Sequence, residues 1–355
     1  HAALPKSIFE PFSLGRLGLK NRIVRSATDE HLATDTGLPT EAQETVYRRL
    51  AEGGTGLIIT GHLFVDYPLG QSGLGQAGIY DDSFAELLKP ITQAGKRRGC
   101  KIAAQISHAG AKYHAGPHRP VAPSAMRAAA DAPVPRRLTQ TEIEELSKSY
   151  VDAASRAAAA GFDGVQVHCA HGYLLSEFVD PYYNHRVDEY GGSVENRMRL
   201  PLEIIRGIKA VCGEDYPVLV KVNSNTRADD EQYGEQLVSM VRMFAQAGAQ
   251  AVELSGYDFA PKTRDRLYFL DRAAQVKAAV PDVPLILVGG LRSVGDMQKA
   301  LDAGIDLVAM CRPLVCQPDA ADRFGSGQET SPCVSCNRCF QNFRTTGFEC
   351  AVRTE

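Results

Sequence analysis

The sequence lacks a strong excess of charge, a long apolar run and an N-terminal secretion signal. Lys and Arg number 39 and Asp and Glu 42, so the net charge is -3 and no general affinity for nucleic acid or anionic membranes is expected. No apolar stretch approaches the length of a membrane-spanning helix, and the N-terminus lacks the pattern of a signal peptide. The remaining composition, 44% hydrophobic and 23% charged, is ordinary for a soluble globular protein.

The nine cysteines do not suit a disulfide framework, because their number is odd and no secretion signal precedes them. We therefore expect reduced thiols and a cytoplasmic location. Four of the cysteines crowd residues 333–350 in the spacing C-x2-C-x2-C-x10-C. Four thiols at this density predict a ligand set for zinc or for an iron–sulfur cluster, with unrelated thiols as the alternative.

Helical stretches that end in glycine are followed repeatedly by short β-branched runs, as in AAAAGFDGVQVH and FAQAGAQAVELS. Together with an early strand at 22–27, the pattern gives eight strands separated by amphipathic helices. The strands are nearly continuous apolar runs, as in a parallel sheet that is covered on both faces. Five glycines are expected in left-handed conformation where helices close: Gly54, Gly99, Gly161, Gly248 and Gly304.

Eight such units without a break in composition favour a closed α/β fold, a single (β/α)8 TIM barrel, over an open doubly wound sheet. The G-x-G-x-x-G turn of open nucleotide-binding sheets is absent after the first strand. We predict a barrel over residues 1–325 and a short Cys-rich segment over 326–355 packed on it. Residues 107–137 and 172–194 are predicted as long loops over the barrel mouth, with a disordered insertion as the alternative for the first.

The barrel mouth collects the side chains at the C-terminal strand ends, and this set holds histidines but no Asp or Glu beside them. His168 and His171 therefore do not complete a divalent-metal site. Two neutral imidazoles can instead polarise a carbonyl oxygen, and Tyr173 adds a phenol that can donate a proton. A structural role remains the alternative for either histidine taken singly.

A phosphate site is predicted at the last two strands. Gly289 and Gly290 follow the seventh strand, and Arg312 follows the eighth. Glycine lets backbone N–H groups approach phosphate oxygens, and a guanidinium binds them in a bidentate manner. The alternative is that the glycines only turn the chain.

The run HCAHGYLLSEFVDPYYNHRVDEYGGSVENRMR, from His168 to Arg199, resembles the signature of the old yellow enzyme family. These are FMN-dependent barrel oxidoreductases related to 2,4-dienoyl-CoA reductase and trimethylamine dehydrogenase. Matching motifs fall in order along nearly the whole chain: LKNRIVRSAT, GLIITG, AAQISHAG, VLVKVN, LVGGLRS and MCRPLVCQPD. The resemblance implies FMN as cofactor, NADH or NADPH as reductant, and a homo-oligomer.

The resemblance also implies roles for individual residues. The flavin ring would be contacted by Ser26, Ala27, Thr28, Gly61, Gln105 and Lys221, and the FMN phosphate by Gly289, Gly290, Cys311 and Arg312. Lys221 stands where the family usually has Arg near the N1–C2 edge of the flavin. Asp29 stands where relatives often carry Thr or Cys, and a carboxylate there would disfavour the reduced flavin unless it turns away.

The activity implied is reduction of the activated C=C bond of enones and enals, an ene-reductase reaction. His168 and His171 would bind the substrate carbonyl, FMN would deliver hydride to the β-carbon, and Tyr173 would protonate the α-carbon. The cluster-bearing relatives imply a [4Fe–4S] centre, ahead of zinc, on Cys333, Cys336, Cys339 and Cys350. The alternatives are an amine or alicyclic dehydrogenase passing electrons through that cluster to a partner protein, an electron-transfer flavoprotein module and, last, a metal-dependent hydrolase.

Overall fold

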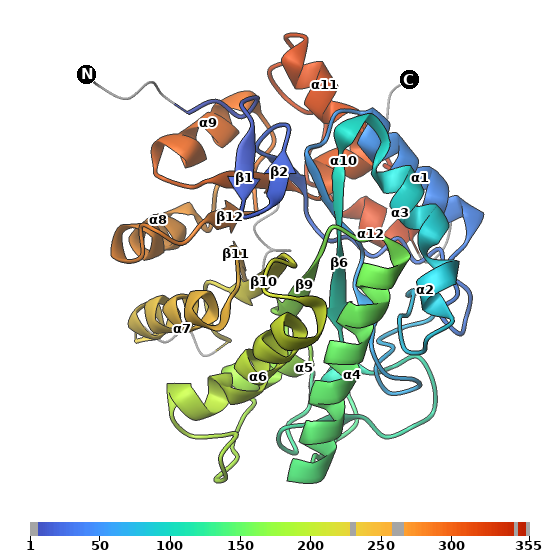
Figure 1. The fold of residues 1–355 in the computed structure, drawn as a ribbon, viewed down its shortest axis with the longest axis vertical. Coiled ribbons are helices and arrows are strands. Elements are labelled where there is room, and N and C mark those ends of the chain that lie inside the picture. Colours follow the sequence, from blue (N-terminus) through green and yellow to red (C-terminus); the bar gives the residue numbers. More distant parts are fainter. Residues whose placement is uncertain (1–5, 228–231, 258–265, 344–346, 353–355) are drawn as a thin grey trace.

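Eight parallel strands close into a barrel in the computed structural model, which describes residues 6–227, 232–257, 266–343 and 347–352 (Figure 1). In chain order they are β3 (Ile23–Arg25), β4 (Leu57–Ile59), β6 (Lys101–Ser107), β9 (Gly164–Cys169), β10 (Val218–Asn223), β11 (Ala251–Ser255), β12 (Leu285–Leu287) and β13 (Leu307–Met310). Each pairs with its neighbours in that order, and β13 pairs with β3, which closes the ring. The predicted (β/α)8 barrel is confirmed.

Helices surround the barrel on its outside (Figure 1). They are α1 (Glu41–Glu52), α2 (Phe84–Leu87), α3 (Lys89–Gly95), α4 (Gln140–Ala160), α5 (Leu174–Val179), α6 (Val194–Cys212), α7 (Tyr233–Ala247), α8 (Leu270–Ala279), α9 (Val294–Asp302), α10 (Arg312–Cys316), α11 (Ala320–Gly325) and α12 (Arg338–Asn342). Two short 3-10 turns are η1 (Arg97–Gly99) and η2 (Gly110–Lys112). None of the helices in the described ranges is long and apolar enough to span a membrane.

The helix ends follow from local side-chain chemistry. Thr40 and Thr139 form capping boxes at the starts of α1 and α4, where each hydroxyl accepts an otherwise unpaired backbone N–H. Positive φ angles between 73° and 114° occur at all five glycines expected to close helices: Gly54, Gly99, Gly161, Gly248 and Gly304. Side chains with a Cβ rarely adopt this conformation, so glycine allows the chain to leave each helix.

The barrel interior is built in layers, because alternate residues of each strand point inward. The lower layer is apolar and includes Leu57, Ala103, Leu219 and Ile286. A hairpin formed by β1 (Phe12–Leu14) and β2 (Leu17–Leu19) packs three leucines against this layer: Leu14, Leu17 and Leu19. Two positions further along, β6 and β10 carry the polar residues Gln105 and Lys221, whereas β4 carries Ile59 and β12 is followed by Val288. The functional site therefore rests on a dry, packed base.

The two predicted loops are tied to each other above the strand ends. The segment 107–137 contains η2 and the strand β7 (Val121–Ala122), which pairs with β8 (Arg136–Arg137). Arg186, from the second loop, is buried and donates hydrogen bonds to the carbonyl oxygens of Pro123 (3.1 Å) and Leu138 (2.6 Å). The first segment is thus an ordered loop, and the alternative of a disordered insertion is wrong.

The C-terminal segment returns to the barrel after α11. The backbone N–H of Val294 donates to the carbonyl oxygen of Glu329, and that of Ser331 donates to the carbonyl oxygen of Arg292. These bonds fasten the segment to the loop that follows β12. They bring α12 and its flanking residues over the open end of the barrel, where the last two strands finish.

Candidate active site

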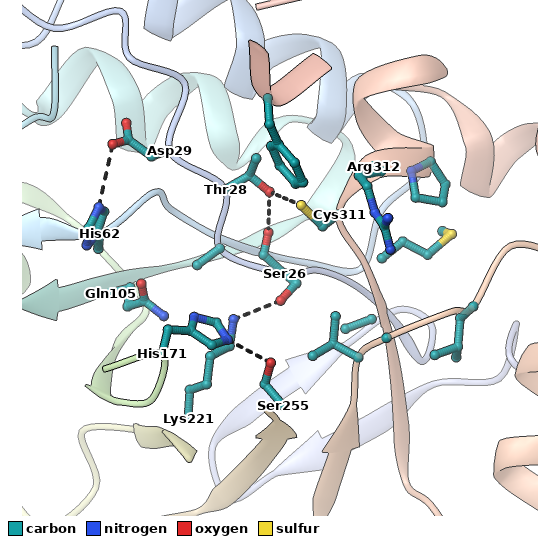
Figure 2. Close-up of a pocket in the computed structure, with 18 of the residues that line it drawn as sticks. Ser26, Thr28, Asp29, His62, Gln105, His171, Lys221, Ser255, Cys311 and Arg312 are labelled. Carbon is teal, nitrogen blue, oxygen red and sulfur yellow. Dashed lines mark hydrogen bonds and ion pairs between the residues drawn. The ribbon is translucent and has the colours of Figure 1, made fainter. Parts of the chain in front are cut away.

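A cavity of about 610 Å³ opens at the C-terminal ends of the barrel strands. Every residue predicted to contact flavin or substrate lines it, apart from Gly61: Ser26, Ala27, Thr28, Gln105, His168, His171, Tyr173, Lys221, Gly289, Gly290, Cys311 and Arg312. Figure 2 shows several of these side chains converging from different strands. Residues that are far apart in the sequence therefore meet on one wall, as the strand-end argument requires.

Gly61 lies beside the cavity and not on its wall. Its N–H donates to the hydroxyl of Tyr47 (3.1 Å), and a Cβ built on it would lie 2.7 Å from the carbonyl oxygen of Thr28. The absence of a side chain lets the end of β4 approach the segment that carries Ser26 and Thr28. Gly61 thus acts on the site through packing, and its expected contact with the flavin stays a prediction.

A polar layer lies directly beneath the cavity. Gln105 donates through Nε2 to Oε1 of Gln166 (2.9 Å), and Gln166 donates through Nε2 to Oε1 of Glu253 (2.9 Å). Ser26 donates to Oε2 of Glu253 (2.6 Å) and accepts from Nζ of Lys221 (2.9 Å; Figure 2). The wall beside Lys221 is therefore one connected hydrogen-bond network that joins four strands and the segment after β3.

The two predicted histidines stand next to each other, with ring centroids 5.3 Å apart. Nδ1 of His168 is buried and has no hydrogen-bond partner in the described ranges. Nε2 of His171 lies 2.8 Å from Oγ of Ser255 (Figure 2). Burial above all, with further lowering by nearby cations such as Lys221, holds the pKa of both imidazoles well below the usual value. Both rings are neutral at neutral pH.

Tyr173 completes this group, with its ring 5.2 Å from that of His168. Nζ of Lys112, from the first loop, lies 4.4 Å from the centre of the Tyr173 ring and donates to the carbonyl oxygen of His171 (3.0 Å). A cation over a phenol stabilises negative charge on that ring. Lys112 belongs to the site, although the sequence analysis did not identify it. Its position in the loop after β6, at the barrel mouth, was the feature that could have indicated it.

The Asp29 carboxylate turns toward two histidines. Its Oδ2 lies 3.5 Å from Nε2 of His62 and 3.6 Å from Nδ1 of His31 (Figure 2). Burial acts to raise the pKa of Asp29, but the hydrogen bond from His62 and the charges of both histidines outweigh it, so the pKa lies below its usual value. The carboxylate that was expected to disfavour a reduced flavin is therefore engaged by imidazoles.

The other end of the cavity suits a phosphate. Gly289 (φ 113°) and Gly290 (φ 73°) are left-handed, and a Cβ on Gly290 would lie 2.6 Å from the backbone nitrogen of Leu267. Arg312 lines this end and donates to Oδ1 of Asn337 (2.8 Å). Arg292 also lines it, and its Nε is buried without a hydrogen-bond partner in the described part of the chain. Two guanidinium groups and a glycine turn form an anion cradle.

The C-terminal segment supplies the remaining wall. Phe340, Gln341 and Phe343 line the cavity, and the Phe343 ring lies 6.0 Å from that of His31. Sequence reasoning assigned this segment only to a metal site. No periodic signal predicts that a segment after the barrel folds across its mouth, so these residues could not be found from the sequence.

The four clustered cysteines line a second, small cavity: Cys333, Cys336, Cys339 and Cys350. Arg312 and Ser335 line both this cavity and the larger one. Within the described residues, no group of three His, Cys, Asp or Glu side chains could hold a metal ion. The four thiols around this cavity stay a predicted ligand set, with an iron–sulfur cluster or a zinc ion as the alternatives.

A barrel with a phosphate cradle, a cationic ring site and a paired-histidine wall defines the class of flavin-dependent barrel oxidoreductases. Residues 7–331 match the NADH:flavin oxidoreductase / NADH oxidase family, and the chain belongs to this family. The resemblance to old yellow enzymes is confirmed. The fit of the cavity to FMN rests on the left-handed Gly289 and Gly290 and on the cationic side chains of Lys221, Arg292 and Arg312 that line it.

Three relatives show the extent of the similarity. The NADH oxidase of Thermoanaerobacter brockii is 36% identical over an alignment of 360 residues that covers 95% of this chain and 55% of the relative. The old yellow enzyme homologue from Zymomonas mobilis superposes with a TM-score of 0.79 at 29% identity, covering 92% of this chain and 95% of the other. A 2-naphthoyl-CoA reductase in complex with 2-naphthoyl-CoA superposes with a TM-score of 0.90 at 26% identity, covering 97% and 56%. The chain spans about half the length of the first curated relatives it matches.

Proposed function

We propose that the protein is an FMN-dependent NAD(P)H oxidoreductase that reduces the activated C=C bond of α,β-unsaturated carbonyl compounds. The observation that carries this proposal is that His168, His171 and Tyr173 line the same cavity as the predicted flavin-site residues. An enzyme that only oxidised NADH would not require a carbonyl-binding pair with a phenol beside it.

The residues that would hold FMN fall into two groups. The phosphate end would use the backbone of Gly289 and Gly290 together with Arg292 and Arg312. The ring end would use the Gln105 amide, the Lys221 ammonium and the segment from Ser26 to Thr28. When bound, FMN accepts hydride from NADH or NADPH and passes it to the substrate in the same cavity.

The substrate would be held by neutral imidazoles. His168 lines the cavity and its imidazole would hydrogen-bond a carbonyl oxygen there, and Nε2 of His171 would do so by releasing Ser255. Hydrogen bonds to that oxygen stabilise the negative charge that develops on it as hydride adds to the β-carbon. Burial keeps both rings uncharged, so they bind the oxygen without taking a proton from solvent.

Tyr173 would supply the proton to the α-carbon from its phenolic O–H. Loss of that proton leaves a phenolate, and the Lys112 ammonium 4.4 Å from the ring centre would stabilise it until a proton returns. The phenol and the two imidazoles thus divide the work: the imidazoles bind the oxygen, and the phenol protonates the carbon.

A second function is favoured by one observation, that Arg312 and Ser335 separate the cysteine cavity from the larger one. We propose that a [4Fe–4S] cluster on the four cysteines would exchange single electrons with a redox partner protein or with a further part of a longer chain. This would serve either the reductase or an amine or alicyclic dehydrogenase that runs in the oxidative direction.

The test uses apoprotein reconstituted with FMN under anaerobic conditions. The visible flavin band should appear on reconstitution, bleach on addition of NADH or NADPH and return on addition of cyclohexenone. His168→Ala/His171→Ala should still be bleached by the nucleotide, whereas reoxidation by cyclohexenone should be lost. His185→Ala, which changes an exposed histidine outside the cavity, should behave as wild type. Protein that does not take up FMN, or a double variant that reduces cyclohexenone normally, would refute the proposal.

A further inference from the structure

We propose that Glu253 is a positioning residue that sets the charge and the hydrogen-bond polarity of the cavity wall against which the flavin lies. The proposal rests on the proposed function, because it concerns a bound FMN. Glu253 is completely buried, does not line the cavity and has no role in the carbonyl-binding group. It is nevertheless the centre of the polar layer beneath the site.

The register of the barrel places Glu253 directly beside Lys221. The two residues are Cα partners in the parallel pairing of β10 with β11, and His168 is the partner of Lys221 on the other side. Nζ of Lys221 lies 3.5 Å from Oε1 of Glu253, and the side chains are 2% and 0% exposed. A lysine at the cavity wall is therefore backed by a carboxylate that solvent does not reach.

The carboxylate also determines which way its neighbours point. An ionised carboxylate only accepts hydrogen bonds, so Gln166 must present its NH2 group to Glu253 and its oxygen to Gln105. Gln105 then donates a hydrogen bond from its NH2 group to Gln166 (2.9 Å). The side-chain oxygen of Gln105 therefore remains an acceptor for a ligand in the cavity. The ring N3–H of a flavin is a donor that needs such an acceptor. Glu253 thus fixes the polarity of a residue with which it has no contact.

The negative charge of Glu253 is also expected to affect the reduction potential of the flavin. A lone cation at the cavity wall would favour a negatively charged reduced flavin, whereas a cation paired with a carboxylate favours it less. Because neither side chain is exposed, solvent screens the charge of the carboxylate little. Glu253 is therefore expected to hold the flavin reduction potential below the value that Lys221 alone would give.

The primary test is Glu253→Gln, which keeps the shape and removes the charge. FMN-loaded protein should show a more positive flavin midpoint potential. Sulfite, which forms an anionic adduct with flavins, should bind more tightly by roughly tenfold or more, as expected when a nearby like charge is removed. Glu253→Asp should return both values toward those of wild type. An unchanged or more negative potential in Glu253→Gln would overturn the proposal.

A control separates this effect from the general cost of neutralising a buried acid. Glu30 is equally buried and is paired with Arg25 (2.9 Å), which, unlike Lys221, does not line the cavity, so Glu30→Gln should leave the potential near that of wild type. A shift of equal size and sign in Glu30→Gln would refute a specific role for Glu253.

If Glu253→Gln does not fold, a second pair of variants tests the proposal. Removing one partner of a buried ion pair is strongly destabilising, whereas removing both charges is often tolerated. Lys221→Gln should lower the flavin midpoint potential. The double variant Lys221→Gln/Glu253→Gln should have a higher midpoint potential than Lys221→Gln alone. Equal potentials in these two variants would overturn the proposal. Failure of wild-type apoprotein to bind FMN would instead refute the proposed function, and the role of Glu253 with it.

Discussion

The guanidinium of Arg312 donates a hydrogen bond of 2.8 Å to the side chain of Asn337, which joins the end of the barrel to the Cys-rich segment. Arg312 follows β13 and lines the phosphate end of the cavity, whereas Asn337 lies between Cys336 and Cys339. Tyr268 holds the other terminal nitrogen of the guanidinium at 3.2 Å. The orientation of the predicted phosphate ligand therefore depends on a residue outside the barrel.

Replacing Asn337 by glycine should weaken FMN binding. Asn337 has φ 62°, a conformation that glycine also adopts, so Asn337→Gly removes the hydrogen bond and not the turn. A hydrogen bond to a charged group contributes roughly 1.5–3 kcal/mol. If losing it misplaces Arg312 and weakens phosphate binding by part of that free energy, the affinity for FMN should fall about tenfold. Flavin fluorescence during titration of apoprotein measures it. Val334→Ala, at an exposed neighbouring position, should bind FMN as wild type does; an equal loss there would argue against the Arg312 link.

Tyr173→Phe should slow substrate reduction more than flavin reduction. The phenol is needed only when the α-carbon takes a proton, and removing a general acid typically costs about 100- to 10,000-fold in the step that uses it. Anaerobic stopped-flow absorbance separates the two half-reactions. Tyr182→Phe, an exposed tyrosine, is the matched control. Equal losses in both half-reactions would remove the role of Tyr173 as proton donor.

The buried histidines should make the protein sensitive to acid. The folded pKa of His168 and of His171 lies well below 6.5, so below pH 6.5 the unfolded chain takes up protons that the folded chain does not. Stability is therefore highest above pH 6.5 and falls as the pH decreases toward the folded pKa, by up to about 1.4 kcal/mol per pH unit for each histidine.

Chemical denaturation at several pH values tests this, because His168→Asn should show a shallower fall below pH 6.5 than wild type. His185→Asn should reproduce the wild-type slope, since that side chain is exposed. If His168→Asn kept the full acid sensitivity, the neutral, buried state of His168 would be contradicted.

Most of the site residues that could be predicted from the sequence lie at the C-terminal ends of strands. His168, Lys221 and Arg312 follow or end apolar runs, and a closed barrel brings all such ends to one mouth. Glu253 was missed although it stands two residues before Ser255, the last residue of β11. Strands buried on both faces show no alternation of apolar and polar residues, so the sequence does not mark which positions point inward one layer below the mouth.

Strand register and contacts between segments far apart in the sequence also could not be predicted from the sequence. The pairing of Lys221 with Glu253 depends on the shear of the closed barrel, which no local pattern reveals. Phe343 reaches the cavity from the segment after the barrel, and Gly61 packs against the carbonyl oxygen of Thr28. In each case the information lies in long-range contacts between segments and not in residue type.

Protein prepared without oxygen should contain iron and acid-labile sulfide in equal amounts, about four of each per chain, if the four cysteines hold a [4Fe–4S] cluster. Cys336→Ser and Cys339→Ser should each lower both contents, whereas Cys212→Ser, at a cysteine that does not line the second cavity, should leave them unchanged. Zinc in place of iron, or neither metal, would contradict the cluster.

The segment that follows α11 forms a wall of the reaction cavity through Phe340 and Phe343 and steadies Arg312 through Asn337. Grafting this stretch from one family member to another would therefore transfer substrate shape and cofactor affinity as a single unit. Directed evolution of selectivity in this scaffold should accordingly find its most productive mutations outside the eight barrel units, and should find that they alter flavin retention at the same time.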